Sequence, residues 1–337
     1  MKIISFFNHK GGVSKTTTTY HVGWKLAQLG KRVLMVDADS QCNLSLTALG
    51  DEGYINLATT NPKNNIKSCL ESVFYAVPEL LKAAKCLKVR GLNNLYLLPG
   101  NFDISEFEVQ LGVSFQLTSS FSTMKNLPGS FSYLLQKTAE SLNIDYILID
   151  LNPSLSAINQ DFIISSDYFI IPASPDYFSQ MAVRSLARII PTWEKWADQA
   201  RVLFEDSTYP LPKIKPKFLG YTINNYTIRN GEPTQAFGEI IEKFDETIRI
   251  VLIPSLDKES MLLPIEAYQN NYCLAQISSF QTLQTKYHKF GKPVYALTDK
   301  ELEASGYVLS TQQEKRTFFD ETYSKLANRI LTLIDRE

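Results

Sequence analysis

Short apolar runs alternate along the chain with longer segments whose apolar residues recur at helical spacing. The runs are rich in Ile, Leu, Val, Phe and Tyr, which favour β-strands. We expect strands at residues 2–8, 32–37, 95–98, 146–150, 168–172, 217–224 and 248–253. Near-continuous apolar strands separated by helices are typical of a parallel sheet covered on both faces, so the pattern predicts an α/β domain of about seven or eight strands.

Two segments interrupt this alternation. Residues 102–128 are rich in Ser, Thr, Phe and Gln, and residues 272–311 have a Lys-rich middle and a long polar tail. We interpret both as insertions in a single domain that spans residues 1–337. Residues 312–337 carry apolar side chains at helical spacing but as much acid as base at the end, which favours a terminal helix packed on the core over a membrane-binding helix.

The clearest candidate chemistry follows the first apolar run. Two glycines precede a helical stretch that opens with Lys15 and Thr16 and stops at Gly30. Backbone N–H groups at a helix N-terminus bind anions, and the helix dipole adds about half a positive charge. Glycine permits close backbone approach, lysine neutralises phosphate, and a hydroxyl suits Mg²⁺. We therefore predict a nucleotide phosphate site formed by Lys10, Gly11, Gly12, Val13, Ser14, Lys15, Thr16 and Thr17.

Residues 10–17, Lys-Gly-Gly-Val-Ser-Lys-Thr-Thr, depart from the ordinary P-loop pattern, which needs glycine at the positions of His9 and Ser14. With its extra lysine, the segment resembles the deviant Walker A loop of the ParA/MinD family of P-loop ATPases, closest to ParA-type proteins without an N-terminal helix-turn-helix domain. Ser40 and Asn152 stand where that family usually has proline. The resemblance continues in the family's order through residues 36–43, 147–155, 169–179, 253–254 and 290–294.

The resemblance implies a P-loop NTPase fold that uses ATP and Mg²⁺. By this resemblance Lys15 holds the β- and γ-phosphates, Thr16 binds Mg²⁺, and Thr17 contacts the α-phosphate. Catalysis of phosphoryl transfer is mostly positioning and charge neutralisation, which these groups supply. The family's adenine pocket maps onto Asn224 and Pro254, although Asn224 with Asn225 is also a plausible Asx-turn.

Three carboxylates complete the predicted site. The resemblance implies that Asp39 positions the attacking water and that Asp37 lies near the metal. It also implies that Asp150 orients a water bound to Mg²⁺. Acidic residues that are two positions apart at the end of a strand direct their side chains to the same side of the sheet. The alternatives are structural, with Asp37 and Asp39 as turn formers and Asp150 as a cap of the next helix.

Lys10 is not needed for nucleotide binding, because Lys15 already supplies a cation. In the family that the chain resembles, the equivalent lysine reaches the nucleotide of a second subunit. The resemblance therefore implies an ATP-dependent homodimer with two-fold symmetry. The alternative is that Lys10 is a solvated loop lysine.

Composition limits the partners. The 34 basic and 35 acidic residues nearly cancel, which leaves room only for a local patch that binds nucleic acid. The four cysteines are not spaced in pairs, and the three histidines are not spaced as metal ligands usually are. Both observations argue against a metal cluster. We expect a cytoplasmic protein without a membrane anchor, since neither a signal peptide nor an apolar run of about 18 residues is present. The histidines are His9, His21 and His288.

Residues 184–229 carry eight basic side chains against four acidic ones. By the resemblance, such a segment favours non-specific DNA binding, nucleoid association, and partition of a cargo with a ParB-like adaptor that stimulates hydrolysis. Ser255 stands where DNA-binding relatives often have a basic residue, and an ordinary solvated helix face remains an alternative. Two other functions remain as alternatives to partition. One is a MinD-like membrane-positioning ATPase, and the other is a biosynthetic ligase of the dethiobiotin-synthetase or cobyrinate-amidase kind. A second basic group is formed by Lys286, Lys289 and Lys292.

Overall fold

An eight-stranded sheet forms the centre of the computed structural model, which describes residues 1–116, 124–229, 232–233 and 235–336. The strand order is β10-β7-β6-β1-β5-β2-β4-β3, and every neighbouring pair is parallel except β3 with β4. The predicted mostly parallel sheet is confirmed. The strands are β1 (Lys2–Phe6), β2 (Val33–Asp37), β3 (Leu87–Lys88), β4 (Leu95–Leu98), β5 (Tyr146–Asp150), β6 (Tyr168–Ala173), β7 (Lys217–Tyr226) and β10 (Cys273–Ser278), with a separate hairpin of β8 (Ile228–Arg229) and β9 (Glu232–Pro233).

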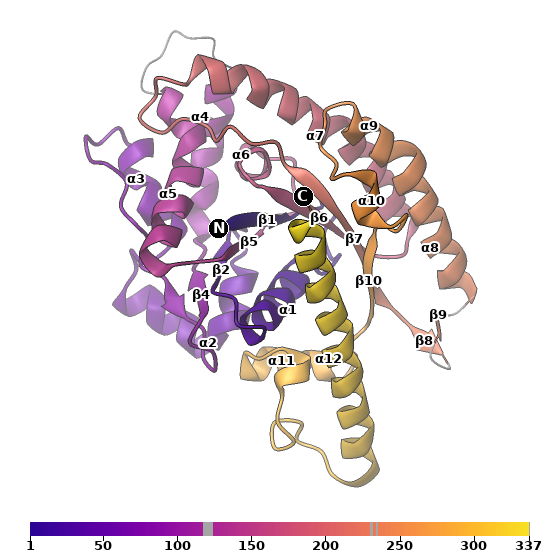
Figure 1. The fold of residues 1–337 in the computed structure, drawn as a ribbon. Helices are drawn as coiled ribbons and strands as arrows, with labels where there is room; N and C mark the ends of the chain where they lie inside the picture. Colours follow the sequence, from indigo (N-terminus) through magenta and orange to yellow (C-terminus); the bar gives the residue numbers. More distant parts are fainter. Residues whose placement is uncertain (117–123, 230–231, 234, 337) are drawn as a thin grey trace.

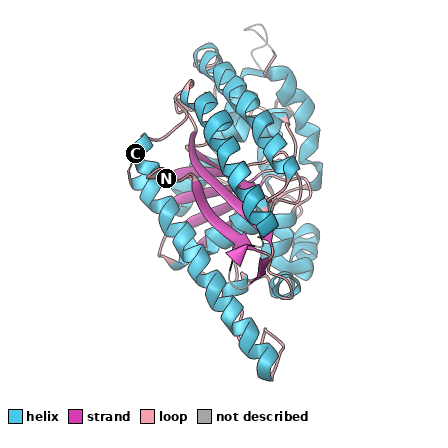
Figure 2. Ribbon diagram, turned by 90° about the vertical axis from the view of Figure 1, so that its right-hand side faces the viewer, coloured by secondary structure: helices cyan, strands magenta, loops and turns pink. Residues whose placement is uncertain are grey.

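Helices cover both faces of this sheet (Figures 1 and 2). Helix α1 packs against α2 and α12, and α11 packs against α2, whereas α5, α6, α7 and α8 form a second connected layer. The helices are α1 (Lys15–Gln28), α2 (Asn43–Thr60), α3 (Ile66–Phe74), α4 (Phe107–Ser114), α5 (Leu127–Leu142), α6 (Ala157–Ile164), α7 (Tyr177–Leu203), α8 (Gln235–Thr247), α9 (Ile253–Asp257), α10 (Ile265–Tyr268), α11 (Leu283–Phe290) and α12 (Gly306–Asp335). Short helical turns are η1 (Phe102–Glu106), η2 (Met124–Asn126), the π-helical η3 (Ile248–Leu252) and η4 (Val294–Ala296).

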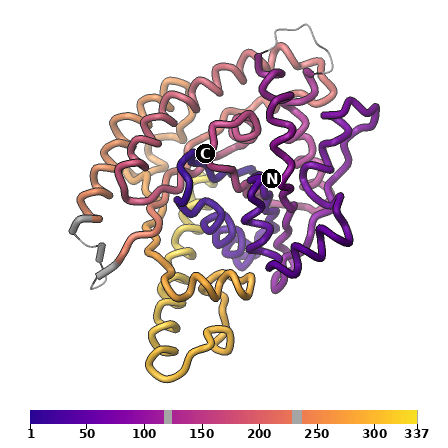
Figure 3. Tube along the Cα trace, turned by 180° about the vertical axis from the view of Figure 1, so that it is seen from behind, coloured from indigo at the N-terminus to yellow at the C-terminus, as the bar shows by residue number. Residues whose placement is uncertain are grey.

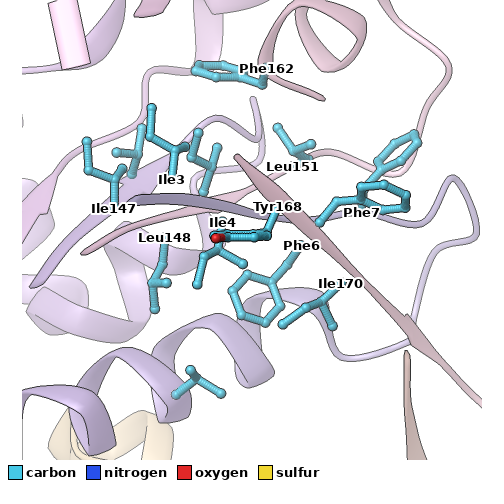
Figure 4. Close-up of a cluster of buried hydrophobic side chains, with 14 of the residues drawn as sticks. Ile3, Ile4, Phe6, Phe7, Ile147, Leu148, Leu151, Phe162, Tyr168 and Ile170 are labelled. Atoms are coloured by element: carbon cyan, nitrogen blue, oxygen red, sulfur yellow. The ribbon is translucent and has the colours of Figure 1, made fainter. Parts of the chain in front are cut away.

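The central strands are buried on both faces. All five residues of β2 and of β5 are buried, which explains their continuous apolar sequences. Figure 4 shows the alternation: Ile3 and Ile147 lie on the side of Phe162, whereas Ile4 and Leu148 lie on the opposite side. The core therefore runs through the sheet, and the site can only form where the strands end.

One predicted strand is wrong. Residues 248–253 are helical, because α8 continues through η3 into α9. The eighth strand of the sheet is instead β10, which is the first part of the segment predicted as the insertion 272–311. In the other predicted insertion, 102–128, the structure places η1, α4 and η2, and residues 117–123 lie outside the described part.

Helix α12 begins at Gly306, earlier than the predicted 312, and packs on α1 and β10. Its first turns and the loop before them project from the body at the bottom of Figures 1 and 3, whereas its C-terminal end lies against the body. Nearer the C-terminus one face of the helix is buried. The buried apolar residues are Phe319, Tyr323, Leu326, Ala327, Ile330, Leu333 and Ile334.

Candidate nucleotide-binding site

Strand register brings the predicted acidic residues to one edge of the sheet. Asp150, the last residue of β5, lies opposite Phe6 of β1 and Asp37 of β2. The loop that starts at Asn8 therefore rises beside both carboxylates. Ligands of open α/β sheets bind at this edge, the carboxyl end of the parallel strands.

The loop before α1 adopts a conformation suited to an anion. Gly12 has a φ of 73°, which favours glycine, and Ser14 adopts the left-handed conformation immediately before the helix. No side chain caps the N-terminus of α1. The N–H groups of its first turn are therefore available to phosphate oxygens.

Two asparagines from β7 hold the loop in place. The amide of Asn224 donates to Val13 O at 2.9 Å, and that of Asn225 donates to Ser14 Oγ at 2.7 Å. Asn224 Oδ1 is buried and has no hydrogen-bond partner among the described residues. Asn224 thus braces the loop directly, which the sequence analysis did not predict, and its oxygen remains as a possible acceptor for a ligand.

A cavity of about 1100 Å³ opens over this loop. All residues from Gly11 to Thr17 line it, together with Asp39 and Asn225. It extends between α2 and α11, and Arg90 also lines it. Tyr287, which the sequence analysis did not single out, also lines it and donates from its hydroxyl to Thr47 Oγ1 at 3.4 Å.

Lys15 lies in the cavity and is 7% exposed. Its ammonium donates to Lys10 O at 3.1 Å. Burial lowers the pKa of Lys15, and the carboxylates of Asp150 and Asp39 act in the opposite direction. This buried cation is close to the acidic residues and to the open N-terminus of α1, as phosphate binding requires.

Asp37, Asp39 and Asp150 have different environments. Asp37 Oδ2 accepts hydrogen bonds from the N–H and hydroxyl of Ser45 at the start of α2, so this carboxylate stabilises that helix end. Burial raises the pKa of Asp37 to about 7, against these hydrogen bonds. Asp39 lines the cavity, and its Oδ1 accepts from Gln41 N at 2.9 Å.

Asp150 is the acidic residue whose surroundings best fit contact with a cation or with a water bound to it. Both carboxylate oxygens are buried without a hydrogen-bond partner in the described part of the chain. Burial, and next the charge of Asp37, raise the pKa of Asp150, while the Thr16 hydroxyl and Lys15 oppose the rise. An unpartnered buried carboxylate is costly, and a cation or its bound water would satisfy it.

This donor set fits Mg²⁺ in a particular way. Within the described ranges, no three His, Cys, Asp or Glu side chains come together as a metal site. Mg²⁺ usually keeps several waters and binds one or two protein groups together with substrate phosphates. Thr16, which lines the cavity, and the buried Asp150 have the chemistry for such groups. The metal roles of Thr16, Asp37 and Asp150 all stay predictions.

Pro254 does not lie at the nucleotide edge. It is the second residue of α9, which packs on α7, and it is not among the described residues that line the cavity. Its predicted place beside adenine depended on a strand at 248–253, which is helical. The outer neighbour of β7 is β10, so the strand end beside Asn224 and Tyr226 is that of β10, at Ile277 and Ser278.

A family model described as an AAA domain matches residues 1–200, more than half of the chain. The chain is 27% identical over 258 residues to the chromosome partitioning protein ParA of Caulobacter vibrioides, covering 75% of this chain and 80% of that one. The chain belongs to the ParA/MinD family of P-loop ATPases. It is 30% identical to the sporulation initiation inhibitor Soj of Bacillus subtilis, over 57% of this chain and 64% of Soj. It is 27% identical to an uncharacterized protein of Methanocaldococcus jannaschii, over 75% of this chain and 85% of that protein.

Solved structures share the ParA-like fold over the whole chain. A Corynebacterium diphtheriae protein superposes with a TM-score of 0.73 at 21% identity and covers 99% of both chains. McdA of Cyanothece has a TM-score of 0.63 at 18% identity over 98% of this chain and 99% of McdA. The pNOB8 ParA bound to nonspecific DNA has a TM-score of 0.59 at 18% identity, over 100% of this chain and 99% of that ParA.

Proposed function

We propose that this ParA/MinD-family chain is a Mg²⁺-dependent ATPase that forms an ATP-dependent homodimer, binds DNA non-specifically, and positions a genetic or protein cargo with the help of a stimulating adaptor protein. The observation that carries the proposal is the separation of its two loop lysines. Lys15 lies inside the cavity, whereas Lys10 is absent from the described residues that line it. Lys10 therefore does not serve the cavity of its own chain, and this placement supports a role at a second nucleotide.

Each residue of the site has a place in this proposal. Lys15 and the first turn of α1 would hold the phosphates, and Thr16 and Asp150 would hold Mg²⁺ and its water. The metal, when bound, neutralises charge on the phosphates. Asp39, which lines the same cavity, would position the attacking water.

The basic residues of the 184–229 segment do not contribute equally. Lys195 pairs with Glu259, Arg201 with Glu194, and Lys213 with Glu205. Lys215 pairs with Asp198, Lys217 donates to Ser260 O, and the side chain of Arg229 lies outside the described part. Arg184 and Arg188 are exposed on α7 and have no ion pair with a described residue, so the proposed DNA contact is strongest there.

Two of the three lysines of the second basic group are paired with acids. Lys289 pairs with Glu303 and Lys292 with Glu301, while Lys286 donates to Gln312. The membrane alternative has less support, because the apolar face of α12 packs against the body. Among the described helices, none combines the length and apolarity needed to cross a bilayer.

The deciding experiment measures DNA binding with ATP, ADP and no nucleotide at several salt concentrations, with liposome sedimentation in parallel. We expect a DNA signal that needs ATP and weakens with salt, because phosphate contacts release counterions. Lys15→Ala, which should bind ATP far more weakly than the wild type, is the control for nucleotide dependence. Liposome binding without DNA binding would favour the MinD-like alternative, and turnover of a small-molecule substrate would favour the ligase.

A further inference from the structure

Lys10 is held by a residue of its own chain. Its ammonium donates to Asp176 Oδ2 and, at 3.1 Å, to Ser179 Oγ. These partners lie 166 and 169 residues further along the sequence. They meet Lys10 because β1 and β6 are neighbours in the sheet and their following loops leave from the same edge.

Asp176 has two separate structural roles, one for each carboxylate oxygen. Oδ1 accepts from Ser179 N at 2.8 Å and caps the N-terminus of α7, a helix of 27 residues. Oδ2 binds Lys10. Because the helix N-terminus also favours a negative charge, the carboxylate stays in place whether or not Lys10 is bound to it.

The pair is accessible to water on both sides. The side chain of Lys10 is 23% exposed and that of Asp176 is 38% exposed. Partial burial alone would raise the pKa of Asp176, but the hydrogen bonds from Lys10 and Ser179 outweigh it and lower the pKa. Ion pairs of this exposure contribute about 0.2–1 kcal/mol, so the contact can be exchanged readily.

We propose that Asp176 is a positioning residue that holds Lys10 away from the nucleotide in the free monomer, so that the ATP-dependent dimer forms only by exchanging this carboxylate for a phosphate of the second copy's nucleotide. The inference rests on the proposed function, because it needs Lys10 to act across a dimer. Asp176 then sets how much ATP is required for dimerisation. A polyphosphate carries several negative charges and competes well against a single half-exposed carboxylate.

Asp176→Asn tests this inference. Asparagine is as good an N-cap as aspartate, so α7 keeps its start while the charge that holds Lys10 is lost. We expect half-maximal dimerisation at an ATP concentration about two- to fivefold lower than in the wild type, the factor that corresponds to an exposed ion pair. Light scattering or sedimentation against ATP concentration measures the shift. Asp176→Ser, another capping residue without charge, should shift the curve in the same direction.

Asp198→Asn is a matched control, because Asp198 lies on the same helix and is also ion-paired, to Lys215 and Arg201. It should leave the ATP requirement unchanged. Combining Asp176→Asn with Lys10→Ala should remove ATP-dependent dimerisation itself, because the lysine that reaches the second nucleotide is missing. ATP affinity measured under monomeric conditions should be unchanged in Asp176→Asn, since Lys15 is intact.

The outcomes separate this inference from the proposed function. A wild-type chain that stays monomeric at saturating ATP and Mg²⁺ would overturn the proposed function, and the inference with it. A wild-type chain that dimerises, with Asp176→Asn needing the same or more ATP, would overturn the inference alone. More ATP would mean that Asp176 itself contacts the second copy.

Discussion

At the scale of residues, the site is defined by a few buried charges that come from separate strands. Lys15 follows β1, Asp39 follows β2, and Asp150 ends β5. Burial lowers the pKa of the lysine and raises the pKa values of both acids, whereas the lysine lowers the pKa of each acid and both acids raise that of the lysine. Between the two acids the effect is repulsive, because Asp39 raises the pKa of Asp150. The acids and the lysine therefore stabilise one another before a ligand arrives.

Replacing Lys15 should remove most of the affinity for ATP. We expect Lys15→Ala to bind ATP about 10- to 100-fold more weakly, because a hydrogen bond to a charged group contributes roughly 1.5–3 kcal/mol. Calorimetric titration with ATP and Mg²⁺ measures the loss. The exposed Lys63 offers a control, and Lys63→Ala should bind like the wild type. Wild-type affinity in Lys15→Ala would contradict the assigned site.

His21 should make the fold sensitive to acid. Its ring stacks on Tyr323, Nδ1 lies 2.8 Å from Thr17 O, and Nε2 accepts from Val294 N, so the neutral ring is required. Burial lowers the pKa of His21 to about 3. The unfolded chain takes up this proton near pH 6.5 and the folded chain does not, so stability falls as pH drops from about 6.5 towards 3.

His21→Gln, which cannot take up that proton, should be less stable than the wild type at pH 7.5. Between pH 6.5 and 4.5, however, it should lose about 2 kcal/mol less of its unfolding free energy than the wild type does. Urea unfolding at several pH values measures the difference. The exposed His288 serves as control, and an equal pH dependence in His21→Gln and wild type would refute the assignment.

At the scale of elements, the start of α5 packs directly on the segment that leads into β7. A Cβ at Gly129 would lie 1.8 Å from Tyr209 O, a backbone atom that cannot rotate away. We expect Gly129→Ala to reduce the unfolding free energy by about 3 kcal/mol. Gly238→Ala in α8 is the matched control, since its Cβ would meet nothing within 4 Å and helix propensity should make it neutral or stabilising. Thermal unfolding of the two variants compares them.

Helix α7 should carry the DNA contact through its two free arginines. Arg184→Ala with Arg188→Ala should weaken ATP-dependent DNA binding and reduce the slope of log affinity against log salt by about two. Lys213→Ala with Lys215→Ala removes the same charge from side chains already paired with acids, so its effect should be smaller. Equal losses in both double variants would mean that DNA contacts the segment of Lys213 and Lys215 as strongly as α7.

Six of the seven predicted strands are confirmed, and the loop before α1 was found from the sequence, because those signals are local. It misplaced a strand at 248–253, where β-branched residues suggest a strand but the preceding helix continues through a π-helical turn. It missed β10, whose Ala275, Gln276 and Ser278 have little β-preference, because pairing with β7 decides that conformation. Asp176 and Asn225 were missed as site residues because their partners lie more than 160 residues away, although Asp176 before a helix is a visible N-cap signal.

At the scale of the whole molecule, hydrolysis and assembly should separate in one variant. We expect Asp39→Ala to bind ATP but to release phosphate about 100-fold more slowly, since a water-positioning group is lost. The dimer, which hydrolysis would otherwise dissolve, should then persist. Phosphate release and light scattering on the same sample measure both properties. Asp51→Ala, which removes an acid further along the same cavity, should turn over normally. Normal hydrolysis by Asp39→Ala would exclude the assigned role.

One face of α1 is covered by residues that lie about 270 to 300 positions later in the sequence. Tyr20 donates to Gly291 O, Tyr295 to His21 O, and Tyr323 stacks on His21. A ribosome that adds about 5–20 residues per second needs roughly 15 to 60 s to travel from α1 to these residues. In a nascent chain, the phosphate loop is therefore attached to α1 while the face of α1 that these later residues cover is still exposed to water. We expect newly made protein to become able to bind ATP only after its last helix is released, so partial chains cannot join the pool of active molecules.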